Sequence, residues 1–62
     1  MDFIELTSLD TNKIVVNASQ ILWLEINMQG LTNVAFSGGV VAVRESIDEI
    51  MSLLQTYSKA KG

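Results

Sequence analysis

Apolar and polar residues alternate at the start of the sequence, where Ile4 and Leu6 fall on one side of the segment and Glu5 on the other. A period of two is typical of a β-strand with one buried face. Farther along, short segments rich in β-branched residues lie between clusters of turn-forming residues. The pattern predicts five strands, at about 2–9, 13–17, 21–28, 32–37 and 40–44.

Clusters of small polar residues and glycine predict where the chain turns. The Asp-Thr-Asn sequence at 10–12 has turn chemistry, so the first two strands are predicted to form a hairpin. Residues 17–20 form a loop or a single helical turn, for which Asn17 is the predicted N-cap. Ser37-Gly38-Gly39 is the clearest turn, because glycine adopts positive φ without steric strain.

The segment 21–28 is the longest apolar stretch, and strand alternation assigns its residues to two faces. One predicted face holds Leu22, Leu24, Ile26 and Met28. The other holds Ile21, Trp23, Glu25 and Asn27. Both faces therefore carry large apolar side chains, unlike those of a sheet with one face in water.

After residue 44 the period of the pattern changes to that of a helix. Ser46 and Glu49 have the spacing of a capping box, in which each side chain accepts a hydrogen bond from the other residue's backbone amide. Asp48 adds negative charge at the positive end of the helix dipole. The predicted helix spans about 47–58, with an apolar stripe formed by Ile47, Ile50, Met51, Leu53, Leu54 and Tyr57.

These elements predict an α+β fold: a small antiparallel sheet or partly open barrel of about five strands, followed by one C-terminal amphipathic helix, in a single domain over 1–62. One helix covers only one side of such a sheet, yet several strands are apolar on both faces. Either the sheet curls into a barrel or another subunit buries its second face. A chain this short has a small core of its own, and without a disulfide or a structural metal it favours stabilisation by self-association. The candidate interface residues are Trp23, Leu22, Leu24, Val15 and Val40.

Composition excludes several classes of function. The 62 residues include no Cys and no His, which excludes disulfides, thiolate or imidazole zinc sites and histidine-dependent catalysis. Four Lys and Arg against seven Asp and Glu give a net charge of −3, a poor match for nucleic acid or anionic membranes. No apolar run reaches the roughly 18 residues of a membrane span, and the N-terminal residues do not resemble a signal peptide. We expect a cytoplasmic protein with no catalytic residue, no cofactor and no metal.

Some residues could bind a ligand, and each also has a structural interpretation that we favour. Gly38 and Gly39 resemble part of a phosphate-binding loop, but a tight hairpin turn explains them without a ligand. Arg44, the only arginine, could pair with an anionic ligand or with Asp48 or a nearby glutamate. The carboxylates of Glu45, Asp48 and Glu49 could hold a metal, but helix capping accounts for them.

Three further side chains have a functional and a structural interpretation. Glu25 is the only charged residue between 14 and 43, and it is either a perturbed acid or a solvated edge residue or partner of Lys13. Trp23 could stack on a ligand, but packing in the core or in a homo-oligomer interface is favoured. Met28 and Met51 are predicted to fill gaps in the core.

Several short motifs together resemble those of a family of small bacterial proteins. They are Ile4-x-Leu6-Thr7, Val16-Asn17-Ala18, Ile21 with Glu25, Thr32-x-Val34, Gly39, and Val43-x-Glu45-Ser46 followed by Glu49-Ile50. Over nearly the whole chain the sequence resembles the FlbD-like flagellar and swarming-motility small proteins. It is also similar to uncharacterised small phage proteins. The resemblance implies a non-enzymatic accessory role and transfers no catalytic residue.

Two functions of different classes follow from these observations. The first is a non-catalytic small binding module that acts as a homo-oligomer through protein–protein contacts, as a motility accessory protein. The alternative is a phage-type oligomer that sequesters a small anionic ligand, such as a nucleotide signal, between subunits. Arg44 and the backbone amides around Gly38 and Gly39 would then hold the ligand. An enzyme is not expected, because carboxylates alone provide few groups that titrate near neutral pH.

Overall fold

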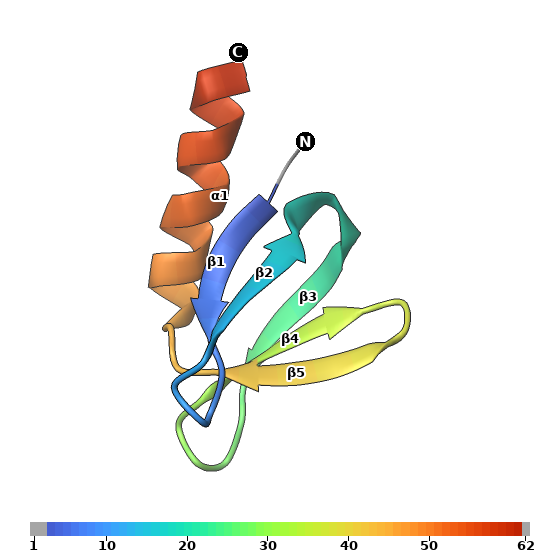
Figure 1. Cartoon of the computed structure of the whole chain (residues 1–62), viewed down its shortest axis with the longest axis vertical. Helices are drawn as coiled ribbons and strands as arrows, with labels where there is room; N and C mark the ends of the chain where they lie inside the picture. The colour runs from blue at the N-terminus through green and yellow to red at the C-terminus, as the bar shows by residue number, and fades with distance from the viewer. Residues whose placement is uncertain (1–2, 62) are drawn as a thin grey trace.

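The computed structural model describes residues 3–61, and for 56–61 it describes the backbone only. Five antiparallel strands form two sheets that do not close into a barrel, and one helix follows them (Figure 1). This arrangement confirms the predicted α+β class. The elements are β1 (Phe3–Thr7), β2 (Lys13–Asn17), the 3₁₀ turn η1 (Ala18–Gln20), β3 (Ile21–Ile26), β4 (Thr32–Phe36), β5 (Gly39–Val43) and α1 (Ile47–Lys61).

The two sheets are joined at one end. The first sheet is the β1–β2 hairpin, and the second is the meander β3–β4–β5. Ser8 forms an isolated bridge with Val43, and the backbone N–H of Arg44 donates to the carbonyl of Thr7 at 2.9 Å. From this junction the two sheets diverge, as Figure 1 shows. The space between them is filled from both sheets and from α1.

The core is built from one face of each sheet and one face of the helix. Ile4 and Leu6 of β1 point into it, as their alternation with Glu5 predicts, and Ile50 comes from α1. Burying an aliphatic side chain of this size stabilises a fold by about 1.5–3 kcal/mol. The buried apolar cluster is Ile4, Leu6, Val34, Val43 and Ile50. With so few buried side chains, each one contributes a large share of the stability of the chain.

A β-bulge in β3 makes the predicted faces of the longest apolar segment wrong at Ile21 and Leu22, whereas the predicted alternation is confirmed from Trp23 to Ile26. Its pairing with β4 shifts between Ile21 and Trp23, where one strand has an extra residue. Ile21 and Leu24 consequently both pack against the core, although alternation predicts opposite faces for them. Leu22 and Trp23, between them, are both exposed. The bulge could not be read from the sequence because all four of these residues are apolar.

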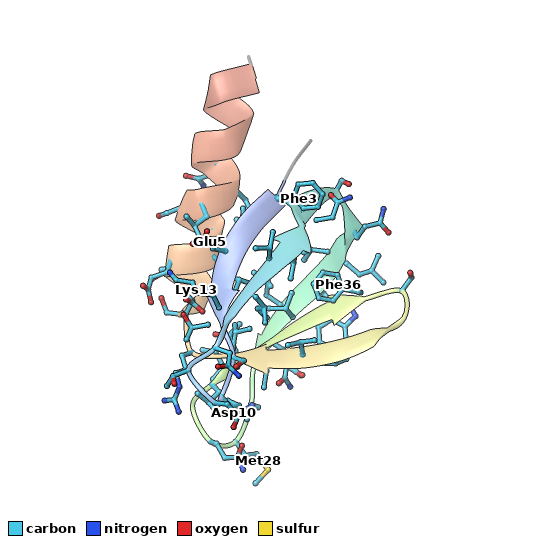
Figure 2. All side chains as sticks on the ribbon, in the orientation of Figure 1. Phe3, Glu5, Asp10, Lys13, Met28 and Phe36 are labelled. Atoms are coloured by element: carbon cyan, nitrogen blue, oxygen red, sulfur yellow. The ribbon has the colours of Figure 1, made fainter. Side chains whose placement is uncertain are left out.

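The predicted third strand is also too long, because the chain turns at 27–31. The backbone N–H of Asn27 donates to the carbonyl of Leu31 at 2.8 Å, and the Asn27 side chain accepts hydrogen bonds from Gln29 and Leu31. Gly30 has φ +80°, which this turn requires. Met28 lies at the tip and is fully exposed (Figure 2), so the prediction that it fills the core is wrong.

Hydrogen bonds confirm two of the predicted helix caps. The side chain of Asn17 accepts from the backbone N–H of Ser19 at 3.0 Å and caps η1. In the capping box, the N–H of Glu49 donates to Ser46 Oγ at 3.1 Å, and the N–H of Ser46 donates to Glu49 Oε1 at 2.9 Å. Of the predicted helical stripe, Ile50 is buried, whereas the side chain of Tyr57 lies outside the described part of the chain.

Glu45 links the chain before the helix to the first strand and to β4. Its carboxylate accepts hydrogen bonds from the backbone N–H of Thr7 at 2.8 Å and from the Thr7 hydroxyl at 2.7 Å. Its backbone carbonyl accepts from the hydroxyl of Thr32, a buried residue, at 2.6 Å. Burial by itself raises the pKa of the Glu45 carboxyl, but the hydrogen bonds from Thr7 outweigh burial and lower it. We call Thr7, Thr32 and Glu45 the Glu45 clasp.

Candidate functional site

Apolar side chains gather on the outer face of the β3–β4–β5 sheet, which is turned away from the core. Trp23, Ala35 and Val40 lie directly opposite one another on the three strands. Trp23 is 49 % exposed and Val40 is 53 % exposed, whereas Ala35 between them is only 2 % exposed. Leu22, at the bulge, is 63 % exposed. We call these four residues the outer-face patch.

The outer-face patch is uncharged and has a polar border on one side. Glu25, Asn33 and Ala42 form the next row across the same three strands. The side-chain amide of Asn27 donates to the side-chain oxygen of Asn33 at 3.2 Å, which fixes both amides at this border. Since the side chains of Ala35 and Ala42 are short, the larger side chains beside them protrude from the face and determine its shape. The arrangement offers apolar contact and carries no acid–base pair.

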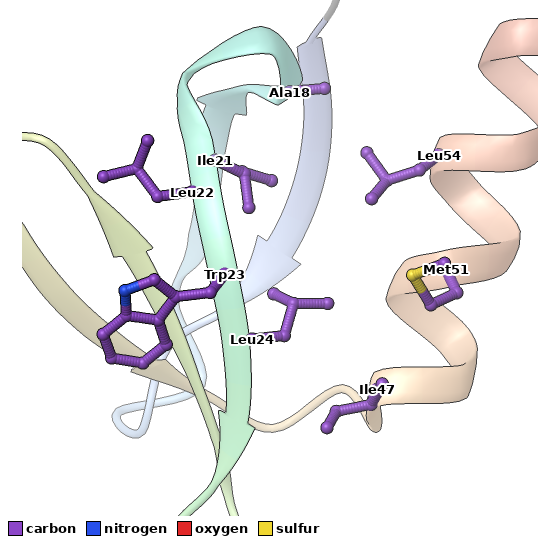
Figure 3. Close-up of a pocket in the computed structure, with 8 residues that line it drawn as sticks. All are labelled: Ala18, Ile21, Leu22, Trp23, Leu24, Ile47, Met51 and Leu54. Carbon is purple, nitrogen blue, oxygen red and sulfur yellow. The ribbon is translucent and has the colours of Figure 1, made fainter.

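A second apolar surface is a groove of about 420 Å³ between β3 and α1. Figure 3 shows Ile21 and Leu24 pointing toward the helix, and Ile47, Met51 and Leu54 pointing back toward the strand. Leu22 and Trp23 extend to the other side of β3 in the same view. Because Leu22 and Trp23 are nevertheless among the residues that line the groove, it adjoins the outer-face patch along β3. We call it the β3–α1 groove.

The candidate interface residues do not form one surface. Leu22, Trp23 and Val40 lie together in the outer-face patch. Leu24 packs against the core and lines the β3–α1 groove. Val15 is exposed on the β1–β2 hairpin, opposite Glu5. Two residues of these surfaces are not predicted from the sequence. Ala35 of the outer-face patch is small and gives no clear signal in a hydropathy pattern, and Met51 of the groove is predicted to lie in the core.

The candidate ligand residues are at opposite ends of β5. Gly39 begins the strand and Arg44 follows its last residue, so five extended residues separate them by about 17 Å. Phe36 pairs with Gly39 across the two-residue turn at 37–38, which confirms the predicted tight hairpin. The guanidinium of Arg44 donates to the carbonyl of Leu9 at 2.6 Å, in place of the predicted pairing with Asp48 or a glutamate. One chain does not bring the candidate ligand residues together.

Glu5, Glu45 and Glu49 have structural partners. Lys13 lies 3.4 Å from Glu5 across the first hairpin (Figure 2), so the predicted pairing of Lys13 with Glu25 is wrong. Glu25 is exposed on the outer face of β3. Glu49 completes the capping box, whereas Glu45 belongs to the clasp and does not cap the helix. Within the described residues, no three acidic side chains come close enough together to hold a metal ion.

The described part of the chain contains no helix with the length and apolar character needed to cross a membrane. Comparisons with family models, with curated proteins and with solved structures find no match to the chain.

Proposed function

We propose that this chain is a small non-catalytic binding module that acts as a homo-oligomer through protein–protein contacts, with the outer-face patch as the contact surface. The observation that carries the proposal is the row of Trp23, Ala35 and Val40 across three strands. An aromatic side chain held beside a small residue in a flat apolar row is a typical interface anchor. The helix does not cover this face, because α1 lies on the other side of β3 (Figure 3).

The size of the chain supports an oligomer. A standard interface buries about 800 Å² per partner, which is close to one fifth of the 4307 Å² surface of this chain. Small domains usually need stabilisation beyond their own core, from a disulfide, a structural metal or a partner subunit. Cys and His, which would form a disulfide or bind zinc, are absent from the sequence. Burial of the outer-face patch against a second copy would supply this stabilisation, at about 25 cal/mol of free energy per Å² of apolar area buried.

The distribution of charge supports a second copy on this face. The chain is acidic, so two copies repel each other wherever their carboxylates approach. Asp48 and Glu49 are on α1, and Glu45 is in the clasp, so these three carboxylates lie away from the patch. Glu25 is the carboxylate at the border of the patch. Two outer-face patches can meet with little repulsion beyond that of Glu25.

The oligomer is tested by measuring native mass while changing the patch. We expect light scattering at micromolar concentrations to give a mass above that of one chain, and emission of Trp23 to shift to the blue as concentration rises. The double substitution Leu22→Gln and Val40→Thr should lower the mass to that of one chain. Val15→Thr, an exposed change of the same kind on the other sheet, should leave it unchanged. A stable monomer for the wild-type chain refutes the proposal.

The resemblance to the FlbD-like family adds a cellular setting to the proposal, namely a motility accessory protein. Gene neighbourhood distinguishes this setting from a phage origin. Flagellar or motor genes beside this one support motility. A phage early region beside it contradicts motility and favours the alternative function.

The alternative is an oligomer that sequesters a small anionic ligand between subunits. The position of the candidate residues favours this over a site in one chain, because an antiparallel arrangement of two β5 strands would bring Arg44 of one copy toward Gly38 and Gly39 of the other. A thermal-shift screen with nucleotides and cyclic nucleotides tests it. We expect a stabilising ligand whose effect is lost in Arg44→Ala. If no anionic ligand shifts the melting temperature, this alternative is wrong.

A further inference from the structure

The β3–α1 groove has apolar walls on two different elements. Ala18 and residues 21–24 line it from the strand side, and Ile47, Met51 and Leu54 line it from the helix. Its volume of about 420 Å³ lies within the range of ligand pockets. Met51 is 42 % exposed here, although a methionine at a helical apolar position is usually covered. The groove therefore leaves apolar surface in contact with water.

An unpaired strand edge runs along the same groove. Within the described residues β3 pairs with β4 and with no other strand. Figure 3 shows β4 and β5 on one side of β3 and the helix on the other. In antiparallel pairs, alternate residues direct their backbone N–H and C=O toward the partner strand. Since Asn27 bonds to Leu31 across the turn, the groups of Leu24 and Ile26 point to the open edge.

These two features together select an extended peptide as the occupant. A strand added to the edge of β3 would pair with the backbone groups of Leu24 and Ile26, and every second side chain of the added strand would enter the groove. A helix cannot pair with that edge, and a small apolar molecule would leave it unpaired. A groove between a strand edge and a helix supplies both hydrogen bonds and apolar pockets for one strand.

Charge determines which peptide fits. Glu25 points to the outer face of β3, the side to which every second side chain of an added strand would also point. The two basic residues among the described side chains are engaged elsewhere: Lys13 with Glu5, and Arg44 with the carbonyl of Leu9. Basic side chains at these alternate positions of the peptide would meet the carboxylate of Glu25. We propose that the β3–α1 groove binds an extended segment of a partner protein that is apolar at alternate positions and has Lys or Arg between them.

The test is an NMR titration of the full chain with the synthetic peptide acetyl-Lys-Val-Lys-Val-Lys-Val-amide. We expect saturable shifts at the amides of Leu24 and Ile26, with an affinity that falls as salt rises. A peptide with Glu in place of Lys should bind at least tenfold more weakly. A version N-methylated along one edge should do the same, because it cannot donate backbone hydrogen bonds to β3.

Two helix variants provide the matched comparison. Met51→Arg should weaken binding at least tenfold, since it places a cation at the wall of the groove. Leu53→Arg changes a residue of similar exposure, 39 % against 42 %, that does not line the groove, and it should change the affinity less than twofold. Equal effects of the two variants overturn the proposal, as does binding of the Glu peptide with the same affinity.

The outcome is independent of self-association through the outer-face patch. Peptide-induced shifts confined to Ala35 and Val40, which do not line the groove, would place the peptide on that patch and refute the groove as its site. Shifts of Leu24 and Ile26 on simple dilution, without peptide, would show that a second copy fills the groove. That result also overturns the proposal.

Discussion

Replacement of Glu45 by Gln tests whether the Glu45 clasp holds the two sheets together. The substitution keeps the size of the side chain but removes its charge, so that two charge-assisted hydrogen bonds from Thr7 become at most weaker neutral ones. A hydrogen bond to a charged group contributes about 1.5–3 kcal/mol and a neutral one about 1 kcal/mol. Because Glu45 is partly exposed to water, we take the lower end, about 1.5 kcal/mol, for each charged bond, and replacement of both by neutral bonds of about 1 kcal/mol gives a loss of about 1 kcal/mol.

This loss is large for a chain of this size. At about 0.05–0.15 kcal/mol per residue, 62 residues give a free energy of unfolding of roughly 3–9 kcal/mol. With a urea dependence of about 1 kcal/mol per M, the unfolding midpoint should fall by about 1 M. Circular dichroism at a fixed protein concentration measures it, since association changes apparent stability. Glu25→Gln, the same chemical change at an exposed position, should leave the midpoint nearly unchanged.

The pH dependence gives a second measurement. The pKa of Glu45 is lowered in the folded chain from its ordinary value of 4.5, so the carboxylate stabilises the fold above that value. This contribution is lost as the pH falls through the lowered pKa. We expect Glu45→Gln to unfold at nearly the same urea concentration as the wild type at the lowest pH, and to differ from it most at neutral pH. An equal midpoint for both chains at pH 7 refutes the clasp as a stabilising contact.

Two local features give further predictions, each measured as the urea midpoint at a fixed protein concentration. Ser46→Ala removes the acceptor for the Glu49 amide in the capping box and should lower the free energy of unfolding by about 1 kcal/mol. Ser52→Ala, at an exposed position inside α1, should have no such effect, and equal losses for the two serines would contradict the cap. Thr11 has φ +64°, a left-handed conformation that a β-branched residue rarely adopts, so Thr11→Asn should raise the free energy of unfolding by about 0.5–1 kcal/mol. A lower midpoint for Thr11→Asn would show that this turn is not strained.

Local interactions made much of the fold predictable. The alternation of Ile4 and Leu6, the cap of η1 by Asn17 and the capping box at Ser46 each depend on residues within a few positions of one another. The bulge in β3 was not predictable, because Ile21 to Leu24 are all apolar and their alternation continues without a visible break. What fixes the bulge is the register with β4, which is a property of the paired strands.

The two surfaces were predictable to different extents. Hydropathy identifies Trp23, Leu22 and Val40, but it adds Leu24, which alternation places on the other side of the strand from Trp23. The bulge brings Leu22 to the side of Trp23. The β3–α1 groove depends on how the helix sits beside β3, which no short motif encodes. A hint was available in the spacing of Ile47, Met51 and Leu54, which extends the apolar face of α1 beyond the side that contacts the core.

The junction between the two sheets has a consequence for the order of folding. The two hairpins β1–β2 and β4–β5 pair residues that are close in sequence, so their loops close with little loss of entropy. The hydrogen bonds from Thr7 to Glu45 span 38 residues and can form only when both sheets are in place. We expect the clasp to be absent from the folding transition state. Thr7→Val should then accelerate unfolding while leaving the folding rate nearly unchanged, so the clasp sets how long the folded chain persists.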